Sequence, residues 1–124
     1  MLERGSGAIV NIASLAAHRG FQLSALYTMS KHAVLGLTRT LAAEWATRGV
    51  RVNAISPGFF MTPLNQAKMS PARKEAALRR TPMHRFGELD ELVGAAIYLC
   101  SPAAGFVTGE AIVVDGGFLA AGLD

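Results

Sequence analysis

The sequence has little cysteine, few aromatic residues and little excess charge, and each shortage excludes a class of protein. Its 124 residues contain one cysteine, 7% aromatic and 17% charged residues, while 51% are hydrophobic. One cysteine, Cys100, cannot form an internal disulfide, so we expect the reducing cytoplasm as its compartment. The formal charge of +3 is too small to predict nucleic-acid binding, and the apolar content is too high for a disordered tail.

Long hydrophobic runs are also absent. The longest apolar stretch, residues 92–100, has nine residues, whereas a membrane-spanning helix needs roughly 20. Residues 1–5 lack the apolar stretch that follows the basic start of a secretory signal. Because a domain usually has roughly 100–150 residues, we expect one soluble, cytoplasmic domain without a membrane segment.

Three short apolar runs predict β-strands, at residues 7–13, 50–56 and 111–114. The first run follows glycines and is apolar almost throughout, which is typical of a strand buried on both faces. A strand, a helix and a strand joined by short turns form a βαβ unit, which implies parallel strands. Because three such strands leave two unprotected edges, the pattern predicts part of a larger, doubly wound α/β sheet.

A long helix is predicted over residues 25–48, ended by Gly49 as its C-terminal cap. Its apolar residues at helical spacing are Val34, Leu37, Leu41 and Trp45. We expect Leu37, Leu41 and Trp45 to pack against the sheet or against another subunit.

Two further helices follow in a less regular region. Ser70 and Pro71 form an N-cap and a first helical residue, which predict a short helix over residues 71–80. Acidic residues near position 88 favour the start of a helix that ends near position 101. Cys100 lies in this apolar helix, and we expect it to be a small buried hydrophobic residue.

The strongest chemical signal is the pair Tyr27 and Lys31. Residues four apart lie on one face of a helix, one turn from each other. A phenol is a weak acid at neutral pH, but a nearby ammonium stabilises its phenolate, so the pair could exchange a proton with an alcohol or carbonyl oxygen. Taken alone, the pair is explained more simply by a tyrosine at a helix start beside a solvated lysine.

Ser14 strengthens the catalytic hypothesis because it follows the first predicted strand. Ligands bind at the carboxyl ends of the strands in open α/β sheets. A hydroxyl there could hold the substrate oxygen that Tyr27 protonates, although serines after a strand also often serve only in a cap or turn.

Four segments carry a resemblance to a known family: residues 9–14 (IVNIAS), 27–33 (YTMSKHA), 51–58 (RVNAISPG) and 114–117 (VDGG). In this order and spacing they resemble the C-terminal half of the short-chain dehydrogenases/reductases. The resemblance runs from about residue 5 to residue 118. It implies reversible hydride transfer between an alcohol or ketone and NAD or NADP, with the nicotinamide cofactor carrying the hydride.

The resemblance also implies a role for individual residues. Tyr27 would be the catalytic acid/base and would also contact the cofactor. Ser14 would position the substrate oxygen, and Lys31 would stabilise the phenolate and bind the nicotinamide ribose. The turn at Pro57 and Gly58 would lie beside the nicotinamide. Phe60 would offer backbone groups to the carboxamide, and Thr62 a hydroxyl to the carboxamide or the phosphates. Relatives of this kind form homo-oligomers, which predicts a dimer or tetramer through the helix over residues 25–48 and the C-terminal helix and strand.

Some family features have no counterpart in the sequence. The glycine-rich turn that binds the pyrophosphate, the residue that selects NAD or NADP, and the Asn-Asn-Ala-Gly segment with its catalytic asparagine would all lie upstream. We therefore expect residues 1–124 to form one partial Rossmann-like domain, the catalytic and substrate-binding half, with Met1 matching an internal position of a longer chain. The alternative hypothesis is a truncated, non-catalytic remnant or an assembly subunit.

Other side chains carry weaker signals. The histidines His18, His32 and His84 share no metal-ligand spacing, so we predict no metal site. Five basic residues gather in the segment that covers the substrate in the family: Arg73, Lys74, Arg79, Arg80 and Arg85. They form either a solvated helix face or a clamp for an acidic substrate.

The substrate is indicated only by short phrases, at residues 57–64, 81–87 and 117–120. They resemble members that act on sugar acids, such as gluconate 5-dehydrogenases, and the basic cluster would suit a carboxylate. Members with other substrates, including 3-oxoacyl thioesters, share these phrases.

Overall fold

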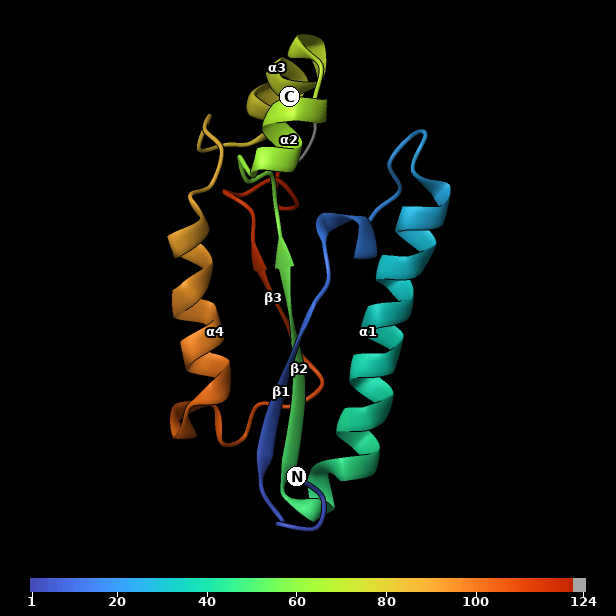
Figure 1. The fold of residues 1–124 in the computed structure, drawn as a ribbon, viewed down its shortest axis with the longest axis vertical. Coiled ribbons are helices and arrows are strands. Elements are labelled where there is room, and N and C mark those ends of the chain that lie inside the picture. Colours follow the sequence, from blue (N-terminus) through green and yellow to red (C-terminus); the bar gives the residue numbers. More distant parts are fainter. Residues whose placement is uncertain (122–124) are drawn as a thin grey trace.

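The protein, described over residues 1–121 by a computed structural model, is built on a three-stranded parallel sheet in the order β1-β2-β3. The strands are β1 (Gly7–Ile12), β2 (Val50–Pro57) and β3 (Ala111–Val114). The helix α1 (Ala25–Trp45) covers one face of the sheet and α4 (Val93–Cys100) the other (Figure 1). The prediction of a parallel, doubly wound α/β arrangement is therefore confirmed.

The buried centre of the sheet is β2, not β1. Residues 52–56 are at most 1% exposed, because β2 has a paired strand on each side and a helix on each face. In β1, residues 7–11 are only partly buried and Ile12 is 57% exposed. The prediction that the first strand is buried on both faces is wrong for this chain, because β1 is paired along one edge only.

Helix α1 packs on the sheet with most, but not all, of the face that was predicted. Its buried residues are Leu35, Thr38 and Ala42, whereas Leu37 is 53% exposed. Packing of Leu37 against the sheet is therefore wrong, while Leu41 and Trp45 pack as expected beside the buried residues of β2. The α-helix ends at Trp45, one 3-10 turn (Ala46–Arg48) follows, and Gly49 ends it with a φ of +71°, which glycine adopts without strain.

Two capped helices stand beyond the carboxyl ends of the strands. The expected helix is α3 (Pro71–Arg80), and the Ser70 side chain accepts a hydrogen bond from the Arg73 amide at its start. A six-residue helix, α2 (Pro63–Lys68), lies before it in the segment predicted to be irregular. Thr62 caps α2 by accepting from the Asn65 amide at 3.1 Å.

The last helix begins with a 3-10 turn (Leu89–Leu92) whose capping box joins Glu88 and Glu91. In α4 only Leu99 is buried, and Cys100 is exposed. The prediction of a buried Cys100 is wrong, because α4 covers the sheet with a narrow face and Cys100 lies on another side of the helix. Shorter 3-10 turns complete the secondary structure, at Leu15–Ala17 and Pro102–Ala104.

Two polar side chains of β2 hold the segment between α4 and β3. The Arg51 guanidinium donates to the carbonyl oxygens of Leu99 at 2.8 Å and Ser101 at 3.2 Å, at the end of α4. The Asn53 amide donates to the Val107 carbonyl at 2.9 Å and accepts from the Glu110 amide at 3.1 Å. Because Asn53 is buried, these bonds satisfy polar atoms that water cannot reach.

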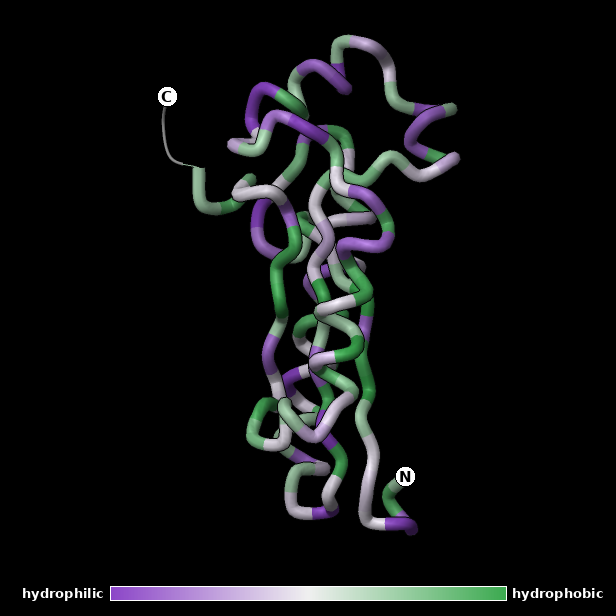
Figure 2. Tube along the Cα trace, turned by 90° about the vertical axis from the view of Figure 1, so that its left-hand side faces the viewer, coloured by the Kyte–Doolittle hydropathy of each residue, from purple (hydrophilic) through white to green (hydrophobic). Residues whose placement is uncertain are grey.

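The molecule is elongated, with the N-terminus at one end and α2 and α3 at the other (Figures 1 and 2). The carboxyl ends of all three strands point toward α2 and α3, so the segments that follow the strands gather at that end. No helix within residues 1–121 is long and apolar enough to cross a membrane.

Candidate active site

A cavity of about 370 Å³ opens at the carboxyl ends of β1 and β2, and four of the predicted site residues meet there. Ser14 after β1, Tyr27 in the first turn of α1, and the Pro57–Gly58 turn after β2 all line it. Residues of α2 and α3 form part of its wall. The sequence separates these positions by up to 44 residues, and the βαβ topology brings them to one place.

Ser14 caps the turn after β1, the structural role that is the alternative to catalysis. This role uses its hydroxyl only as an acceptor, so the O–H donor remains free. Its Oγ accepts a hydrogen bond from the Ala16 amide at 3.2 Å and so caps the 3-10 turn after β1. A hydroxyl can accept and donate at the same time. Within residues 1–121 the Ser14 O–H donates to no protein acceptor, so its proton is available to a substrate oxygen in the cavity.

Tyr27 and Lys31 lie one turn apart on α1, as predicted. Tyr27 is 51% exposed, and the Lys31 Nζ lies 5.7 Å from the centroid of its ring. Lys31 is not merely solvated, because its Nζ donates to the Ile12 carbonyl oxygen at 2.9 Å, at the end of β1. This bond fixes the ammonium between the end of the strand and the tyrosine, with two further N–H donors left over.

Gly58 is required by a close approach of two strand ends. Its amide donates to the Val114 carbonyl at 2.8 Å, and a Cβ at this position would lie 2.6 Å from the Asp115 Cα. No side chain fits there without moving the backbone. The turn that forms the floor of the cavity is therefore held against the end of β3.

Phe60 and Thr62 do not line the 370 Å³ cavity. Phe60 is buried, and its carbonyl oxygen already accepts from the Thr62 amide at 2.9 Å and the Asn65 Nδ2 at 2.8 Å. The Thr62 hydroxyl accepts from the Asn65 amide while capping α2. Both residues thus have structural functions, and the roles expected for them stay predictions.

An aromatic cluster that the sequence motifs did not indicate joins the three loops at this end. The Phe21, Phe59 and Phe118 rings pack with centroid distances of 5.3 to 6.4 Å, and the Arg19 guanidinium lies 5.8 Å from the Phe118 centroid. Each phenylalanine follows a different strand. The signal in the sequence is a phenylalanine three to eight positions after each predicted strand.

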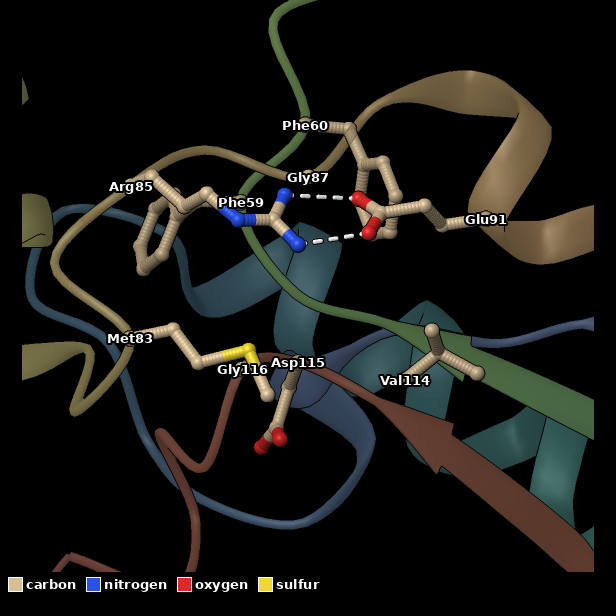
Figure 3. A pocket seen from close by; sticks show the side chains of 9 residues that line it. All are labelled: Phe59, Phe60, Met83, Arg85, Gly87, Glu91, Val114, Asp115 and Gly116. Atoms are coloured by element: carbon tan, nitrogen blue, oxygen red, sulfur yellow. Dashed lines mark hydrogen bonds and ion pairs between the residues drawn. The ribbon is translucent and has the colours of Figure 1, made fainter.

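A second cavity, of about 260 Å³ (Figure 3), shares the lining residue Phe59 with the first. Phe60, Met83 and Val114 line it, and the ion pair of Arg85 and Glu91 crosses one side of it. The two guanidinium nitrogens of Arg85 lie 2.8 and 2.5 Å from the two carboxylate oxygens of Glu91.

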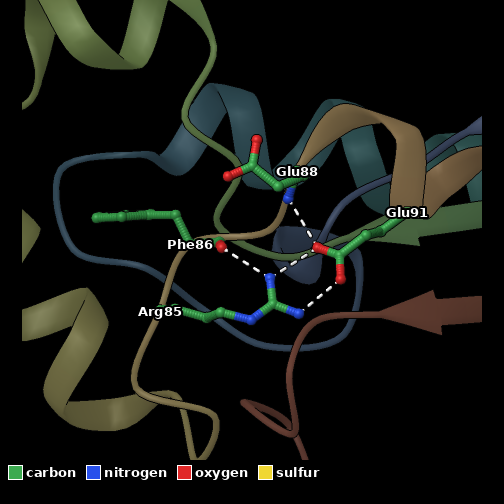
Figure 4. A network of polar contacts seen from close by, with 4 residues as sticks. All are labelled: Arg85, Phe86, Glu88 and Glu91. Atoms are coloured by element: carbon green, nitrogen blue, oxygen red, sulfur yellow. Dashed lines mark hydrogen bonds and ion pairs between the residues drawn. The ribbon is translucent and has the colours of Figure 1, made fainter.

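The Glu91 carboxylate is held in its charged form (Figure 4). The hydrogen bonds from the Arg85 guanidinium, followed by that from the Glu88 amide, lower the pKa of Glu91 to about 2. Because this pair lies at the surface, it orders the start of the last helix more than it stabilises the fold.

A histidine not assigned any role from the sequence joins the loop after β1 to the sheet. The His18 Nε2 lies 2.8 Å from the Oγ of the fully buried Ser56. Partial burial, followed by the positive Arg39 and by His32, lowers the pKa of His18, and Asp115 opposes this shift. Among residues 1–121 no group of three or more histidine, cysteine or acidic side chains is arranged to hold a metal ion.

Comparisons with known proteins agree with the geometry. A family model described as enoyl-(acyl carrier protein) reductase matches residues 1–119. The 2-dehydro-3-deoxy-D-gluconate 5-dehydrogenase of Bacillus subtilis (strain 168) is 46% identical over 120 residues, 96% of this chain and 47% of that protein. The galactitol 2-dehydrogenase (L-tagatose-forming) of Cereibacter sphaeroides is 48% identical over 121 residues, 95% of this chain and 48% of that one.

A solved structure shows the same arrangement of elements. The crystal structure of a gluconate 5-dehydrogenase from Burkholderia cenocepacia J2315, in complex with NADP and tartrate, matches with a TM-score of 0.93 at 41% identity. The match covers 98% of this chain and 48% of that one. The chain thus spans about half the length of the relatives that it matches.

Proposed function

The chain belongs to the short-chain dehydrogenase/reductase family, and we propose that its 370 Å³ cavity is a site of reversible hydride transfer between an alcohol or ketone and NAD or NADP. The observation that carries this proposal is the meeting of Ser14, Tyr27 and the Pro57–Gly58 turn in one cavity, with Lys31 against Tyr27. The names of the relatives support a sugar acid or a polyol as the substrate.

The proposed chemistry divides between two hydroxyls and one ammonium. In the direction of reduction, the Tyr27 hydroxyl gives its proton to the substrate oxygen as that oxygen gains negative charge, and Ser14 donates a hydrogen bond to the same oxygen. Lys31, fixed by the Ile12 carbonyl, stabilises the phenolate that Tyr27 becomes. In the direction of oxidation, the same phenolate accepts the proton of the alcohol.

A nicotinamide cofactor, which would supply or accept the hydride when bound, would find donors beside this site, on residues that do not line the 370 Å³ cavity themselves. Lys31 keeps two donors for ribose hydroxyls, and the Thr62 O–H is free to donate within residues 1–121. The Pro57–Gly58 turn would lie beside the ring. The Phe60 carbonyl is already saturated, so the role proposed for Phe60 falls to its backbone N–H.

The chain offers a matched pair of variants for the test, since it contains two tyrosines. NADH and NADPH are titrated into the purified chain by fluorescence and calorimetry, and turnover of sugar acids and polyols is then measured. We expect Tyr27→Phe to retain cofactor binding and lose turnover by roughly 10²-fold or more, and Tyr98→Phe, on α4, to change neither. Turnover that survives in Tyr27→Phe would contradict the proposed role.

The second candidate function, an assembly subunit, is favoured by a different observation. Large apolar side chains are exposed along both outer helices: Leu26, Met29 and Leu37 on α1, and Val93 and Ile97 on α4. Exposed apolar patches mark interaction surfaces, so we propose a homo-oligomer, a dimer or tetramer, formed through α1 and through α4 with β3. The lone, exposed Cys100 is consistent with the proposed cytoplasmic location.

Light scattering on the purified chain tests the assembly, with Leu37→Glu as the variant. We expect an oligomer that dissociates in the variant, because a carboxylate would be buried unpaired at the interface. A monomer at micromolar concentration would exclude the assembly. Saturable binding of neither NADH nor NADPH by a folded, oligomeric chain would favour the non-catalytic function over the enzyme.

A further inference from the structure

The charged side chains that line the 370 Å³ cavity are all positive. Its charged lining residues are Lys68, the last residue of α2, and Arg73, near the start of α3. No acidic side chain of residues 1–121 lines it. The remaining wall is apolar, from residues such as Leu64 and Met69, or carries uncharged residue types, namely the hydroxyl side chains of Ser14, Ser24 and Tyr27 and the amide of Asn65.

Some basic side chains near this cavity form hydrogen bonds or ion pairs within the protein, and others have free donors. Lys74 donates to the Gln66 carbonyl at 3.1 Å, and Arg85 is paired with Glu91. Within the part of the chain that the structure describes, the side chains of Lys68 and Arg73 make no hydrogen bond or ion pair. Arg79 and Arg80, further along α3, also have free side-chain donors within residues 1–121, but they do not line the cavity, so Lys68 and Arg73 are the available cations that face it.

The position of these cations suits a substrate with two different ends. Arg73 can bind a carboxylate through two parallel N–H donors, and Lys68 adds a point charge from the neighbouring helix. The hydroxyls of Ser14 and Tyr27 line the same cavity and would meet a carbonyl or hydroxyl group. A volume of about 370 Å³ is near the lower end of the range for ligand pockets, roughly 300–1,000 Å³, which suits a small metabolite.

We propose that Lys68 and Arg73 bind the carboxylate of a hydroxy acid or oxo acid whose reacting carbon lies at Ser14 and Tyr27, and that they select acids over neutral polyols. This inference rests on the proposed function, because it uses the same cavity. The inference goes beyond the proposed function because it selects sugar acids over polyols as the substrate class and assigns this selection to Lys68 and Arg73.

Binding of a matched pair of ligands tests the inference without any turnover. D-gluconate and D-glucitol have equal carbon chains and differ at one end, a carboxylate against a hydroxymethyl group. Calorimetry or ligand-detected NMR measures their dissociation constants with the purified chain, its Arg73→Gln and Lys68→Gln variants, and Lys74→Gln as the matched control. Lys74 carries the same positive charge and lies on the same helix as Arg73, but outside the cavity lining.

We expect the chain to bind gluconate more tightly than glucitol, and Arg73→Gln to weaken gluconate binding by about tenfold or more while glucitol binding stays unchanged. Lys68→Gln should have a smaller effect in the same direction, and Lys74→Gln none. Equal loss of both ligands in Arg73→Gln, an equal effect of Lys74→Gln, or no preference for gluconate in the unmodified chain would overturn the inference. This binding assay involves no hydride transfer. It therefore tests the role of Lys68 and Arg73 independently of the Tyr27→Phe turnover assay, which tests the proposed function.

Discussion

Replacing His18 tests a hydrogen bond that holds the loop carrying Ser14 to the middle of the sheet. Ser56 is 0% exposed, and among residues 1–121 its Oγ bonds to one side chain, the His18 imidazole at 2.8 Å. His18→Ala leaves a buried hydroxyl without a partner, a loss that costs about 1–3 kcal/mol. Ser56→Ala instead removes the buried hydroxyl, and the exposed His18 can bond to water, so we expect a cost of about 1 kcal/mol or less.

Urea unfolding followed by the fluorescence of the single tryptophan, Trp45, measures these free energies. We expect His18→Ala to be less stable than Ser56→Ala, and the double variant to be no less stable than Ser56→Ala alone. If His18→Ala unfolds at the same urea concentration as the unmodified chain, the reasoning is refuted, because water then replaces the imidazole at Ser56 without loss.

The same bond predicts a pH dependence. The pKa of His18 lies below its ordinary value of 6.5 in the folded state, because of partial burial and the charges of Arg39 and His32, which Asp115 only partly offsets. The unfolded chain therefore takes up this proton first as the pH falls. The contribution of His18 is complete above pH 6.5 and is lost as the pH falls through the folded-state value. The difference in stability between the unmodified chain and His18→Ala should shrink below pH 6.5, and a constant difference would contradict this account.

Three further predictions concern other contacts. Gly58→Ala should destabilise the fold by about 1–3 kcal/mol in urea unfolding, because the added Cβ would lie 2.6 Å from a backbone atom. Gly36→Ala is the control: its Cβ would point into open space on α1, so it should stabilise the fold by about 0.5–1 kcal/mol. Arg85→Ala should raise the pKa of Glu91 from about 2 toward 4.5 in an NMR titration, and an unmoved value would show that the pair does not form. Arg51→Met should cost about 1–3 kcal/mol, measured as a lower urea midpoint, since it removes the charged donors at the end of α4.

The elements that could be predicted from the sequence are those specified by neighbouring residues. The strands are continuous apolar runs, Ser70 caps α3, and Gly49 ends the first long helical segment, so each signal lies within a few positions of its effect. Helix α2 escaped prediction because its six residues are too few to show a period. Its capping residue, Thr62, is also the residue from which a cofactor contact is expected, so two compatible roles are assigned to it.

The features that could not be predicted depend on tertiary packing. Two helical faces of α1 are apolar, and only the position of β2 decides that Leu35 is buried and Leu37 exposed. The exposure of Cys100 depends in the same way on how much of the sheet α4 covers. The bond between His18 and Ser56 joins residues 38 positions apart and follows no spacing rule. The grouping of Ser14, Tyr27 and Pro57, by contrast, follows from parallel strands ending at one edge, so that part of the candidate site was predictable.

The aromatic cluster has a consequence for the two cavities. The Phe59 ring lines both of them, so it is a single partition between two compartments. A rotation of this ring that enlarges one compartment narrows the other. The ring also packs edge-on against Phe21 and Phe118, so a rotation of Phe59 would change its contacts with both rings. The width of the compartment that holds Ser14 and Tyr27 is thereby set partly by Phe118, a residue that lies 104 positions after Ser14 and does not line either compartment.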